Sequence, residues 1–197
     1  MKPVRTITAT ALPLDRSDVD TDQIIPSDWL KRVERTGFEQ GLFSEWREDP
    51  SFVLNDPRFA EARILVAGPN FGTGSSREHA VWAIQQYGFE AVISPRFGDI
   101  FRNNATKNGL VPVQVSEKMV RTLFDSIAAL PSIEIIIDVE ELFVVCPVAG
   151  VKSDFPLDPA VQHRLLNGLD DIGLTLAHTD AIDSFEAGRP DWLPSLA

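Results

Sequence analysis

Short apolar runs alternate with amphipathic helical patterns between residues 62 and 130, and this alternation constrains the fold more than any other feature of the chain. Each run is too short for a core helix and is bounded by glycine, proline or serine, which is typical of a buried strand. Strands that alternate with helices predict a layered α/β fold. The expected strands are 62–68, 91–95 and 111–115, and the expected helices are 76–87, 97–109 and 117–130.

The segments on either side of this region extend the prediction to a mixed sheet with flanking helices. Residues 4–14 read as an N-terminal strand, and two further apolar runs, 133–138 and 142–148, indicate antiparallel pairing. Ser116 is expected to cap the helix at 117–130. Pro159 is expected to open a short helix that ends near residue 168, and residues 174–190 are expected to form a docked helical segment.

Residues 27–50 do not fit either pattern. They mix aromatic and charged side chains, and glycines and prolines interrupt the stretch. The sequence therefore predicts a long loop with short helical turns, and long ordered loops in compact domains are often functional. We expect this loop to be mobile in the absence of a partner.

The charge of the chain excludes several classes of partner. The formal net charge is −11 over 197 residues, and a field of that sign repels nucleic acids and anionic membrane surfaces. No apolar run approaches the length needed to cross a bilayer, and the N-terminus does not resemble a signal peptide. An anionic substrate would therefore need a site built locally from arginines and backbone N–H groups.

The cysteine and histidine content predicts that the chain binds no metal and resides in the cytoplasm. Cys146 is the single cysteine, and it stands in an apolar run that favours a buried, inert thiol over a nucleophile. The three histidines, His79, His163 and His178, lack the spacing of metal ligands.

The stretch FGTGSSREHA, at residues 71–80, is the strongest candidate for a functional site. It follows an expected strand and precedes an expected helix, at the edge of the sheet where α/β proteins bind ligands. Glycines and the free N–H groups of a helix N-terminus favour an anion site. Arg77 adds a planar group that can bind a carboxylate through two hydrogen bonds.

A purely structural interpretation of the same stretch is equally compatible with its residue pattern. Ser75 and Glu78 fit a capping box at the start of the helix, and His79 is then an ordinary first-turn residue. Two features favour function: Arg77 in the first turn opposes the helix dipole, and capping does not require the second serine, Ser76. The stretch matches neither a phosphate-binding Walker loop nor a dinucleotide-binding fingerprint.

Three blocks of sequence resemble the swivelling domain of the aconitase superfamily. They are DVDTDQIIP at 18–26, NFGTGSSREHA at 70–80 and FGDIFRNNATKNGLVPV at 97–113, and they occur in the order typical of that domain. The segment 169–194 resembles the C-terminus of bacterial 3-isopropylmalate dehydratase small subunits. Together these blocks span nearly the whole chain.

The resemblance implies a single swivelling β/β/α domain over residues 1–197, with a substrate-recognition loop at about 27–50. It implies that Ser75 is the general base that removes the carbon-bound proton of a small hydroxy-dicarboxylate, converting 2-isopropylmalate to 3-isopropylmalate through 2-isopropylmaleate. Ser76 and Arg77 would hold a substrate carboxylate, and Asp22 would line or support the site.

The resemblance also implies a partner. The iron–sulfur (4Fe-4S) cluster of the family is held by cysteines of a separate large subunit, and a lone cysteine cannot ligate such a cluster. The chain would therefore provide half of an active site and bind no cofactor itself.

One departure from the superfamily pattern bears on the substrate. Aconitases carry Trp-Leu-Lys-Phe-Arg after the acidic turn, whereas this chain has Trp29, Leu30, Lys31, Arg32 and Val33. An apolar contact from Leu30 or Trp29 would suit an isopropyl group in place of a carboxylate arm. Both side chains are equally compatible with a simple packing role.

Two alternatives remain open at this point. The chain resembles, within the same superfamily, small subunits that act on other hydroxyacids, such as homoaconitate or a methylmalate. It is also compatible with a non-catalytic anion-binding module, which would need no cysteine-bearing partner.

Overall fold

The computed structural model describes residues 1–75, 77–190 and 192. Within these residues, a seven-stranded mixed sheet runs in the order β4-β3-β2-β1-β5-β6-β7. The first four strands of this order are parallel, and the remaining pairings are antiparallel, which confirms the predicted α/β fold with a mixed sheet. The strands are β1 (Thr6–Leu14), β2 (Ile64–Ala67), β3 (Ala91–Ser94), β4 (Val111–Gln114), β5 (Glu134–Asp138), β6 (Phe143–Cys146) and β7 (Val151–Asp154).

The long strand β1 joins the two halves of the sheet. Its first part, residues 6–10, pairs antiparallel with β5, and its last part, residues 11–14, pairs parallel with β2. The parallel and antiparallel halves therefore share one strand but use different stretches of it.

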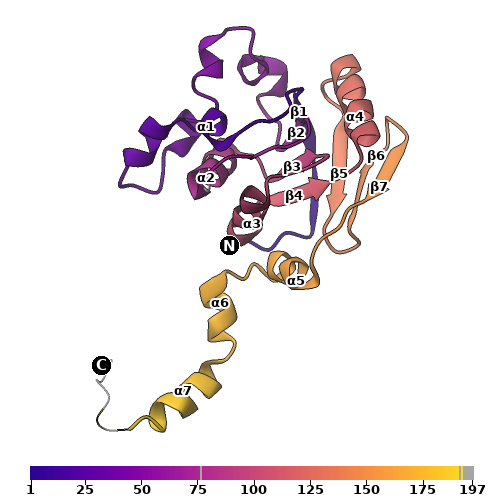
Figure 1. Cartoon of the computed structure of the whole chain (residues 1–197). Helices are drawn as coiled ribbons and strands as arrows, with labels where there is room; N and C mark the ends of the chain where they lie inside the picture. The colour runs from indigo at the N-terminus through magenta and orange to yellow at the C-terminus, as the bar shows by residue number, and fades with distance from the viewer. Residues whose placement is uncertain (76, 191, 193–197) are drawn as a thin grey trace.

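Helices cover both faces of the parallel half. α2 and α3 connect neighbouring parallel strands and contact each other on one side, whereas α4 contacts β1, β2 and β3 from the other side (Figure 1). The predicted cap of α4 is confirmed, because the Ser116 side chain accepts a hydrogen bond from the Met119 backbone N–H at 3.2 Å. The helices are α1 (Thr21–Ile24), α2 (Glu78–Tyr87), α3 (Asp99–Asn108), α4 (Glu117–Ala129), α5 (Pro159–Asn167), α6 (Asp171–Leu176) and α7 (Thr179–Ala187).

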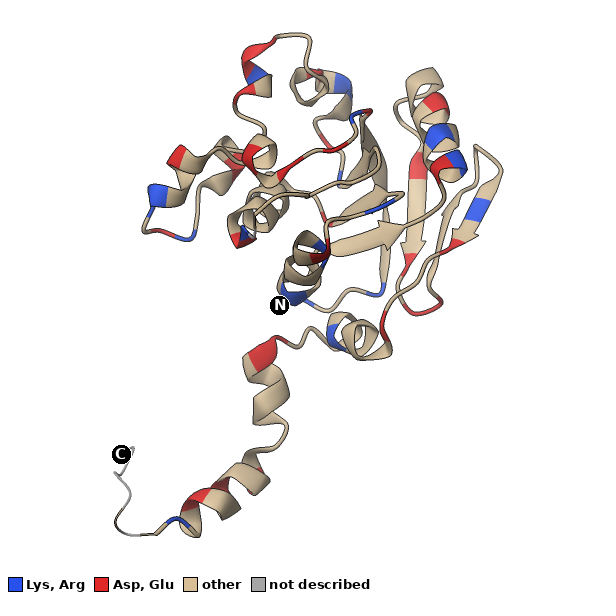
Figure 2. Cartoon of the chain, in the orientation of Figure 1, with Lys and Arg blue, Asp and Glu red and all other residues tan. Residues whose placement is uncertain are grey.

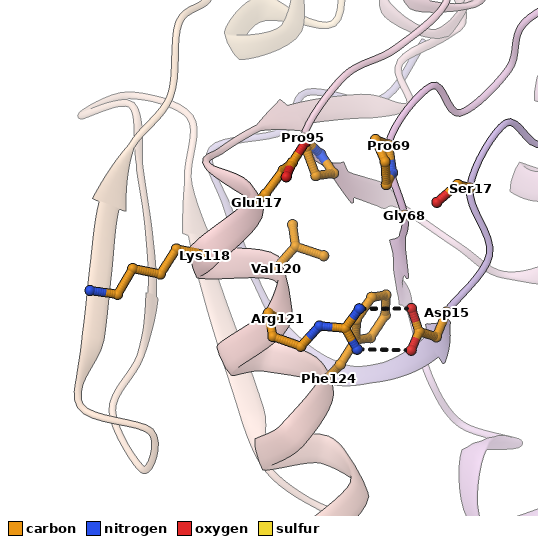
Figure 3. Close-up of a pocket in the computed structure, with 10 residues that line it drawn as sticks. All are labelled: Asp15, Ser17, Gly68, Pro69, Pro95, Glu117, Lys118, Val120, Arg121 and Phe124. Atoms are coloured by element: carbon orange, nitrogen blue, oxygen red, sulfur yellow. Dashed lines mark hydrogen bonds and ion pairs between the residues drawn. The ribbon is translucent and has the colours of Figure 1, made fainter.

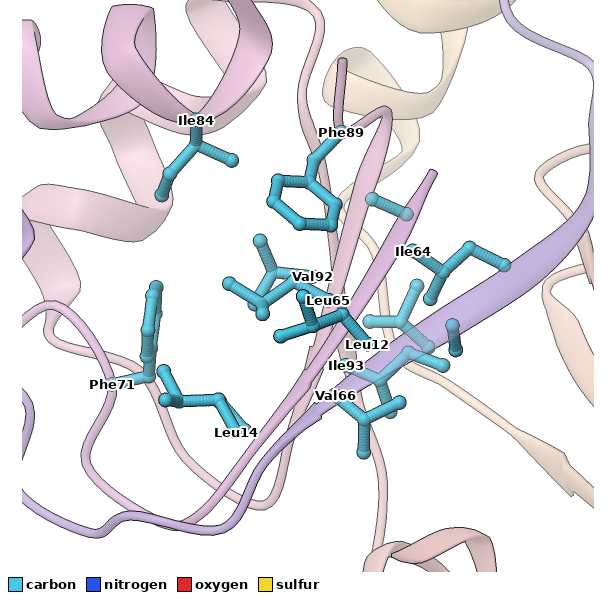
Figure 4. Close-up of a cluster of buried hydrophobic side chains, with 14 of the residues drawn as sticks. Leu12, Leu14, Ile64, Leu65, Val66, Phe71, Ile84, Phe89, Val92 and Ile93 are labelled. Carbon is cyan, nitrogen blue, oxygen red and sulfur yellow. The ribbon is translucent and has the colours of Figure 1, made fainter. Parts of the chain in front are cut away.

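The core lies on both sides of β2 and β3, whose residues are all buried. Leu65 pairs with Val92, and both point to the side of the sheet where Ile84 of α2 lies (Figure 4). Val66 and its partner Ile93 point to the opposite face. The alternation of a strand combined with burial on both faces explains why these runs are continuously apolar.

The predicted strands are observed, and each is shorter at one or both ends than its sequence pattern indicated, as are the helices α2, α3, α4 and α5. The helical segment expected at 174–190 is divided into α6, which begins earlier, at Asp171, and α7. One strand was not predicted. β7 (Val151–Asp154) is an edge strand whose residues are alternately half-buried and exposed, and it contains a lysine, a serine and an aspartate. Such a polar composition does not distinguish an edge strand from a loop.

The excursion at 27–50 is a loop with short helical turns, as predicted, formed by η1 (Ser27–Lys31), η2 (Phe38–Gln40) and η3 (Trp46–Glu48). Two further turns, η4 (Val53–Asn55) and η5 (Pro57–Phe59), lead into β2. The second half of the excursion is anchored: Phe43 is fully buried and stacks on Trp46 at 5.3 Å, and the Arg16 guanidinium lies 4.0 Å from the Trp46 ring. Residues 31–36, in contrast, are exposed.

The C-terminal segment is helical, but the expectation that it docks on the domain is wrong. α6 and α7 project away from the sheet as an arm and contain no buried residue (Figure 1). At its base the Arg164 guanidinium pairs with Asp171 at 2.7 Å. The Gly173 backbone N–H donates to the carboxylate of Asp170, which lowers the pKa of Asp170 below its usual value. Large apolar side chains along the arm are exposed, namely Ile172, Leu176, Phe185 and Trp192.

Among the residues that the structure describes, no helix has the length and apolarity that a membrane crossing requires.

Candidate functional site

Three loops meet at the carboxyl ends of β1, β2 and β3, where parallel strands in α/β sheets place their ligand sites. The loop after β2 is joined to the loop after β3 through Phe71. Its N–H donates to the Arg96 carbonyl at 3.0 Å, and its carbonyl accepts from the Gly98 N–H at 2.9 Å. A Cβ at Gly98 would lie 2.4 Å from the Gly72 carbonyl oxygen, so only glycine permits this close approach.

The same loop is joined on its other side to the acidic turn after β1. The Gly72 N–H donates to the Val19 carbonyl at 2.7 Å, and the Thr21 N–H donates to the Thr73 carbonyl at 2.9 Å. The Thr21 hydroxyl, which is buried, donates to the Ser75 carbonyl at 2.9 Å. The backbone of Ser75 is therefore held in place by a residue of the acidic turn.

Asp20 shapes the acidic turn. Its carboxylate accepts from the Gln23 N–H at 2.8 Å, and the Gln23 side chain accepts from the Asp20 N–H at 3.0 Å, which forms a capping box at the start of α1. Asp22 then stands in the first turn of α1, and its side chain is exposed.

Asp22 and Arg77 form an ion pair across the two loops. The Arg77 side chain is largely buried, with 17% of its area exposed, whereas 57% of the Asp22 side chain is exposed. The buried guanidinium is thus oriented by a carboxylate from the neighbouring loop. The structure brings together three residues that the sequence analysis singled out, Asp22, Ser75 and Arg77.

The structural interpretation of Ser75 and Glu78 as a capping box is wrong. α2 begins at Glu78, and its N-cap is Arg77, whose backbone is extended and whose side chain makes no capping hydrogen bond. Arg77 therefore precedes the first turn of α2 instead of lying in it. The Glu78 carboxylate accepts from the Asn108 side chain of α3 at 2.8 Å and does not reach back to Ser75. The hydrogen bonds to the acidic turn hold residues 72–75 outside the helix.

The Ser75 side chain is left available. Ser75 is exposed, and among the described residues no group hydrogen-bonds its hydroxyl. Gly74, just before it, has a φ of +90°, a conformation that favours glycine. Ser76 lies outside the described residues.

Trp29 and Leu30 lie in the separate excursion at 27–50, and both are half-buried. The Trp29 ring packs on Gly41, where a Cβ would lie 2.6 Å from it, and the Arg32 guanidinium lies 4.8 Å from the centre of the same ring. Trp29 thus has a packing role inside the loop, and contact of either side chain with a substrate remains a prediction. Val33, at the position where aconitases carry the arginine, is 92% exposed.

A hollow of about 420 Å³ lies at the same edge of the sheet, between the N-terminal part of α4 and the loops after β1, β2 and β3 (Figure 3). An ion pair between Arg121 and Asp15, at 3.0 Å, spans one end of it. Neither Ser75 nor Arg77 lines this hollow.

Metal-binding residues do not gather in the described part of the chain, where no group of three or more His, Cys, Asp or Glu side chains is placed to hold an ion. Cys146 is fully buried in β6, in agreement with the expectation of an inert thiol.

Two models of known protein families match separate parts of the chain. The family model of the aconitase C-terminal domain matches residues 1–118. The family model of the C-terminal domain of 3-isopropylmalate dehydratase small subunits matches residues 171–197. The second match begins at the first residue of α6 and includes both helices of the projecting arm.

Similar proteins cover nearly the full length. The 3-isopropylmalate dehydratase small subunit of Frankia alni is 62% identical over 188 residues, which is 95% of each chain. The protein of the same name from Rubrobacter xylanophilus is 56% identical over 196 residues, which is 100% of each chain. The crystal structure of 3-isopropylmalate dehydratase from Methanocaldococcus jannaschii matches with a TM-score of 0.64 and 26% identity, covering 92% of this chain and 99% of that one.

Proposed function

Because this chain belongs to the family of 3-isopropylmalate dehydratase small subunits, we propose a role for each of its site residues in that reaction. The chain is the small subunit of a hydro-lyase of leucine biosynthesis, which interconverts 2-isopropylmalate and 3-isopropylmalate. The dehydration and rehydration proceed through 2-isopropylmaleate. As a small subunit it acts with a large subunit, and we place the complex in the cytoplasm, where a reduced thiol such as Cys146 is stable.

Ser75 is the proposed general base that removes the carbon-bound proton of the substrate. The observation that carries this assignment is the hydrogen bond from the buried Thr21 hydroxyl to the Ser75 carbonyl, which fixes the backbone while the side chain stays exposed. A serine hydroxyl is a weak base at neutral pH, so the alkoxide must be stabilised where it forms. We assign that stabilisation to the positive charge of the Arg77 guanidinium, whose attraction for the alkoxide is strengthened when the large subunit excludes water.

Arg77 is the proposed ligand of a substrate carboxylate. Its guanidinium has five N–H donors, and the ion pair with Asp22 occupies only one edge of the fork. Asp22 orients the guanidinium before the substrate arrives, which lowers the entropy cost of binding. Ser76 is assigned to the same carboxylate from the sequence resemblance alone.

Residues 27–50 are the proposed recognition loop of a single swivelling domain that spans residues 1–197. Leu30 and Trp29 are assigned to the isopropyl group of the substrate. An exposed apolar residue at the tip, Val33, supports a loop that meets an apolar surface. On the same loop the Lys31 ammonium bonds to the Asp28 carboxylate and lowers the pKa of that carboxyl.

The iron–sulfur (4Fe-4S) cluster of the family does not fit this chain, since Cys146 is buried in β6 and is the single cysteine of the sequence. We therefore assign the cluster to cysteines of the large subunit.

The test of this function is a reconstitution. The purified chain, the purified large subunit and the mixture of both are assayed on 2-isopropylmalate, a methylmalate and homocitrate. We expect turnover of 2-isopropylmalate in the mixture only. Activity of the chain alone would contradict the two-subunit proposal, and preference for another hydroxyacid would contradict the proposed substrate.

Arg77→Lys is expected to raise the KM of the reconstituted enzyme about tenfold while kcat changes little. Lysine keeps the charge but loses the planar fork that binds a carboxylate through two hydrogen bonds. The control is Arg63→Lys, because Arg63 makes a two-pronged pair with Glu90 away from the site. The measurement is kcat and KM of both variants by steady-state kinetics. A fall in kcat at unchanged KM would contradict a role of Arg77 in ground-state substrate binding.

The projecting arm is the proposed docking element for the large subunit. Its helices are six and nine residues long, and isolated helices of that length are marginal in water, so the exposed Ile172, Leu176 and Phe185 require a surface to cover them. The arm is also acidic, with Asp180, Asp183 and Glu186 on α7 (Figure 2).

The charge of the chain indicates which molecule covers the exposed apolar residues of the arm. The whole chain carries −11, so docking of the arm on its own domain or on a second copy would bring like charges together. The complementary surface is an apolar groove with basic residues at its rim, and we assign it to the large subunit. The match of the small-subunit family model to residues 171–197 supports this assignment, since the arm is a feature of chains that work as small subunits.

A further inference from the structure

Besides the face that packs on the sheet, α2 has a second face that contacts the excursion at 27–50. His79, Trp82 and Gln86 are spaced three and four residues apart, so they lie on the same side of the helix. This side faces the start of the η2 turn. The Phe38 ring is buried, and its centre lies 5.3 Å from that of His79 and 5.6 Å from that of Trp82.

The side-chain amide of Gln86 makes two hydrogen bonds to the backbone of the excursion. Its Oε1 accepts from the Phe38 N–H at 2.9 Å, and its Nε2 donates to the Arg35 carbonyl at 2.8 Å. Gln86 is exposed to solvent, yet both its donor and its acceptor are engaged. A carboxamide is needed for this arrangement, because one end must accept and the other must donate.

The segment that Gln86 holds is closed on itself. The Arg32 guanidinium donates to the Gly37 carbonyl at 3.0 Å. Gly37 has a φ of +86°, and a Cβ there would lie 2.5 Å from Arg32 Nη1, so glycine permits the closure. Residues 32–37 thus form a small closed loop with Val33 at its exposed tip.

Gln86 therefore connects this closed loop to the helix that begins directly after Arg77. The helix α2 therefore joins two parts of the proposed site. Arg77, the proposed carboxylate ligand, directly precedes its first turn, and Gln86, which holds the proposed recognition loop, lies in its last turn. A displacement of the loop relative to α2 would change the distance between the two parts of a bound substrate.

We propose that Gln86 is a positioning residue that fixes the recognition loop relative to the Ser75–Arg77 segment and thereby sets substrate affinity. This inference rests on the proposed function of residues 27–50. It does not place Gln86 in contact with the substrate.

The first part of the test uses the chain without its partner and is independent of any activity. Hydrogen exchange of the Phe38 amide is compared in wild type, Gln86→Ala and Gln85→Ala. Gln85 is the matched control, because the same substitution in the same helical turn removes a hydrogen bond to the Asn108 carbonyl of α3 instead. In Gln86→Ala we expect the amide to exchange about 3- to 10-fold faster, the factor that corresponds to one modest hydrogen bond.

Trypsin gives a second readout on the same samples, because it cleaves after Arg32 and Arg35 in the closed loop and after Lys31 directly before it. Cleavage there should accelerate in Gln86→Ala and match wild type in Gln85→Ala. Equal protection of the segment in all three chains would overturn the proposal.

The second part uses the enzyme reconstituted with the large subunit. Gln86→Ala should raise KM about 3- to 10-fold with kcat nearly unchanged, and Gln85→Ala should behave as wild type. Gln86→Glu should also raise KM, because it keeps an acceptor for Phe38 but loses the donor to Arg35. An unchanged KM in Gln86→Ala, or an equal rise in Gln85→Ala, would contradict the positioning role.

A failure of the proposed function gives a different pattern. If the wild-type mixture does not act on 2-isopropylmalate, the proposed effect of Gln86 on substrate affinity is contradicted together with the proposed function. The attachment of the loop by Gln86 is then still decided by the exchange and cleavage data.

Discussion

Ser75→Ala is expected to lower the turnover of the reconstituted enzyme about 100- to 10,000-fold, the range typical of a lost general acid or base. The melting temperature of the isolated chain should hardly change. α2 begins at Glu78, and the hydrogen bond from Thr21 reaches the backbone carbonyl of Ser75, which alanine retains. Substrate binding should also be close to normal, because the hydroxyl acts on the reacting carbon and Arg77 remains in place.

Ser116→Ala provides the matched control. Ser116 caps α4 through the Met119 N–H at 3.2 Å, so this variant should lose about 1 kcal/mol of stability and keep its turnover. The measurements are melting temperature of the isolated chain, and kcat and KM after mixing with the large subunit. A Ser75→Ala enzyme with normal turnover would show that the base lies elsewhere.

Deletion of residues 169–197 is expected to weaken binding to the large subunit on the order of 100-fold or more, since buried apolar anchors dominate interface energies. Activity at low protein concentration should be lost with it. The isolated chain should remain folded, because α6 and α7 contain no buried residue. Calorimetry of the mixture and a melting curve of the truncated chain measure the two effects.

A single substitution tests the same interface without removing backbone. Phe185→Ser should weaken binding, whereas Leu130→Ser, at an exposed apolar residue outside the arm, should not. Unchanged affinity of the truncated chain would contradict docking through the arm. A drop in the mass of the free chain from dimer to monomer on truncation would instead identify a second copy as its occupant.

Local signals explain which elements the sequence predicts well. β2 and β3 are recognisable in the sequence because burial on both faces makes them continuously apolar. The cap at Ser116 is recognisable because its hydrogen bond lies within the first turn of its own helix. β7 lacks such a signal, since an edge strand needs little burial.

Predictions fail where distant segments decide the outcome. Ser75 and Glu78 have the spacing of a capping box, but hydrogen bonds to the acidic turn hold Ser75 outside the helix. The apolar spacing of the arm indicates a helix correctly, yet it does not tell which molecule covers it.

The candidate site was predictable only in part. Arg77 is predicted from its chemistry and its place at the end of a strand, whereas the roles of Ser75 and Asp22 come from the resemblance. Their residue types alone do not exclude a structural role. Gln86 was missed, because its partners lie 48 and 51 residues away in a loop without regular pattern. Thr21 was missed for the same reason, since its hydroxyl acts on a carbonyl 54 residues away.

The division of β1 between two partners has a consequence for the order in which the chain is synthesised. Residues 11–14 gain their partner when β2 leaves the ribosome, but residues 6–10 have none until β5 at 134–138 emerges. At ribosomal rates of about 5–20 residues per second, the apolar residues Ile7 and Ala9 remain on an unpaired strand edge for several seconds before β5 is synthesised. A nascent chain halted before residue 134 is therefore the species most exposed to aggregation, and chaperone binding is expected to concentrate on it.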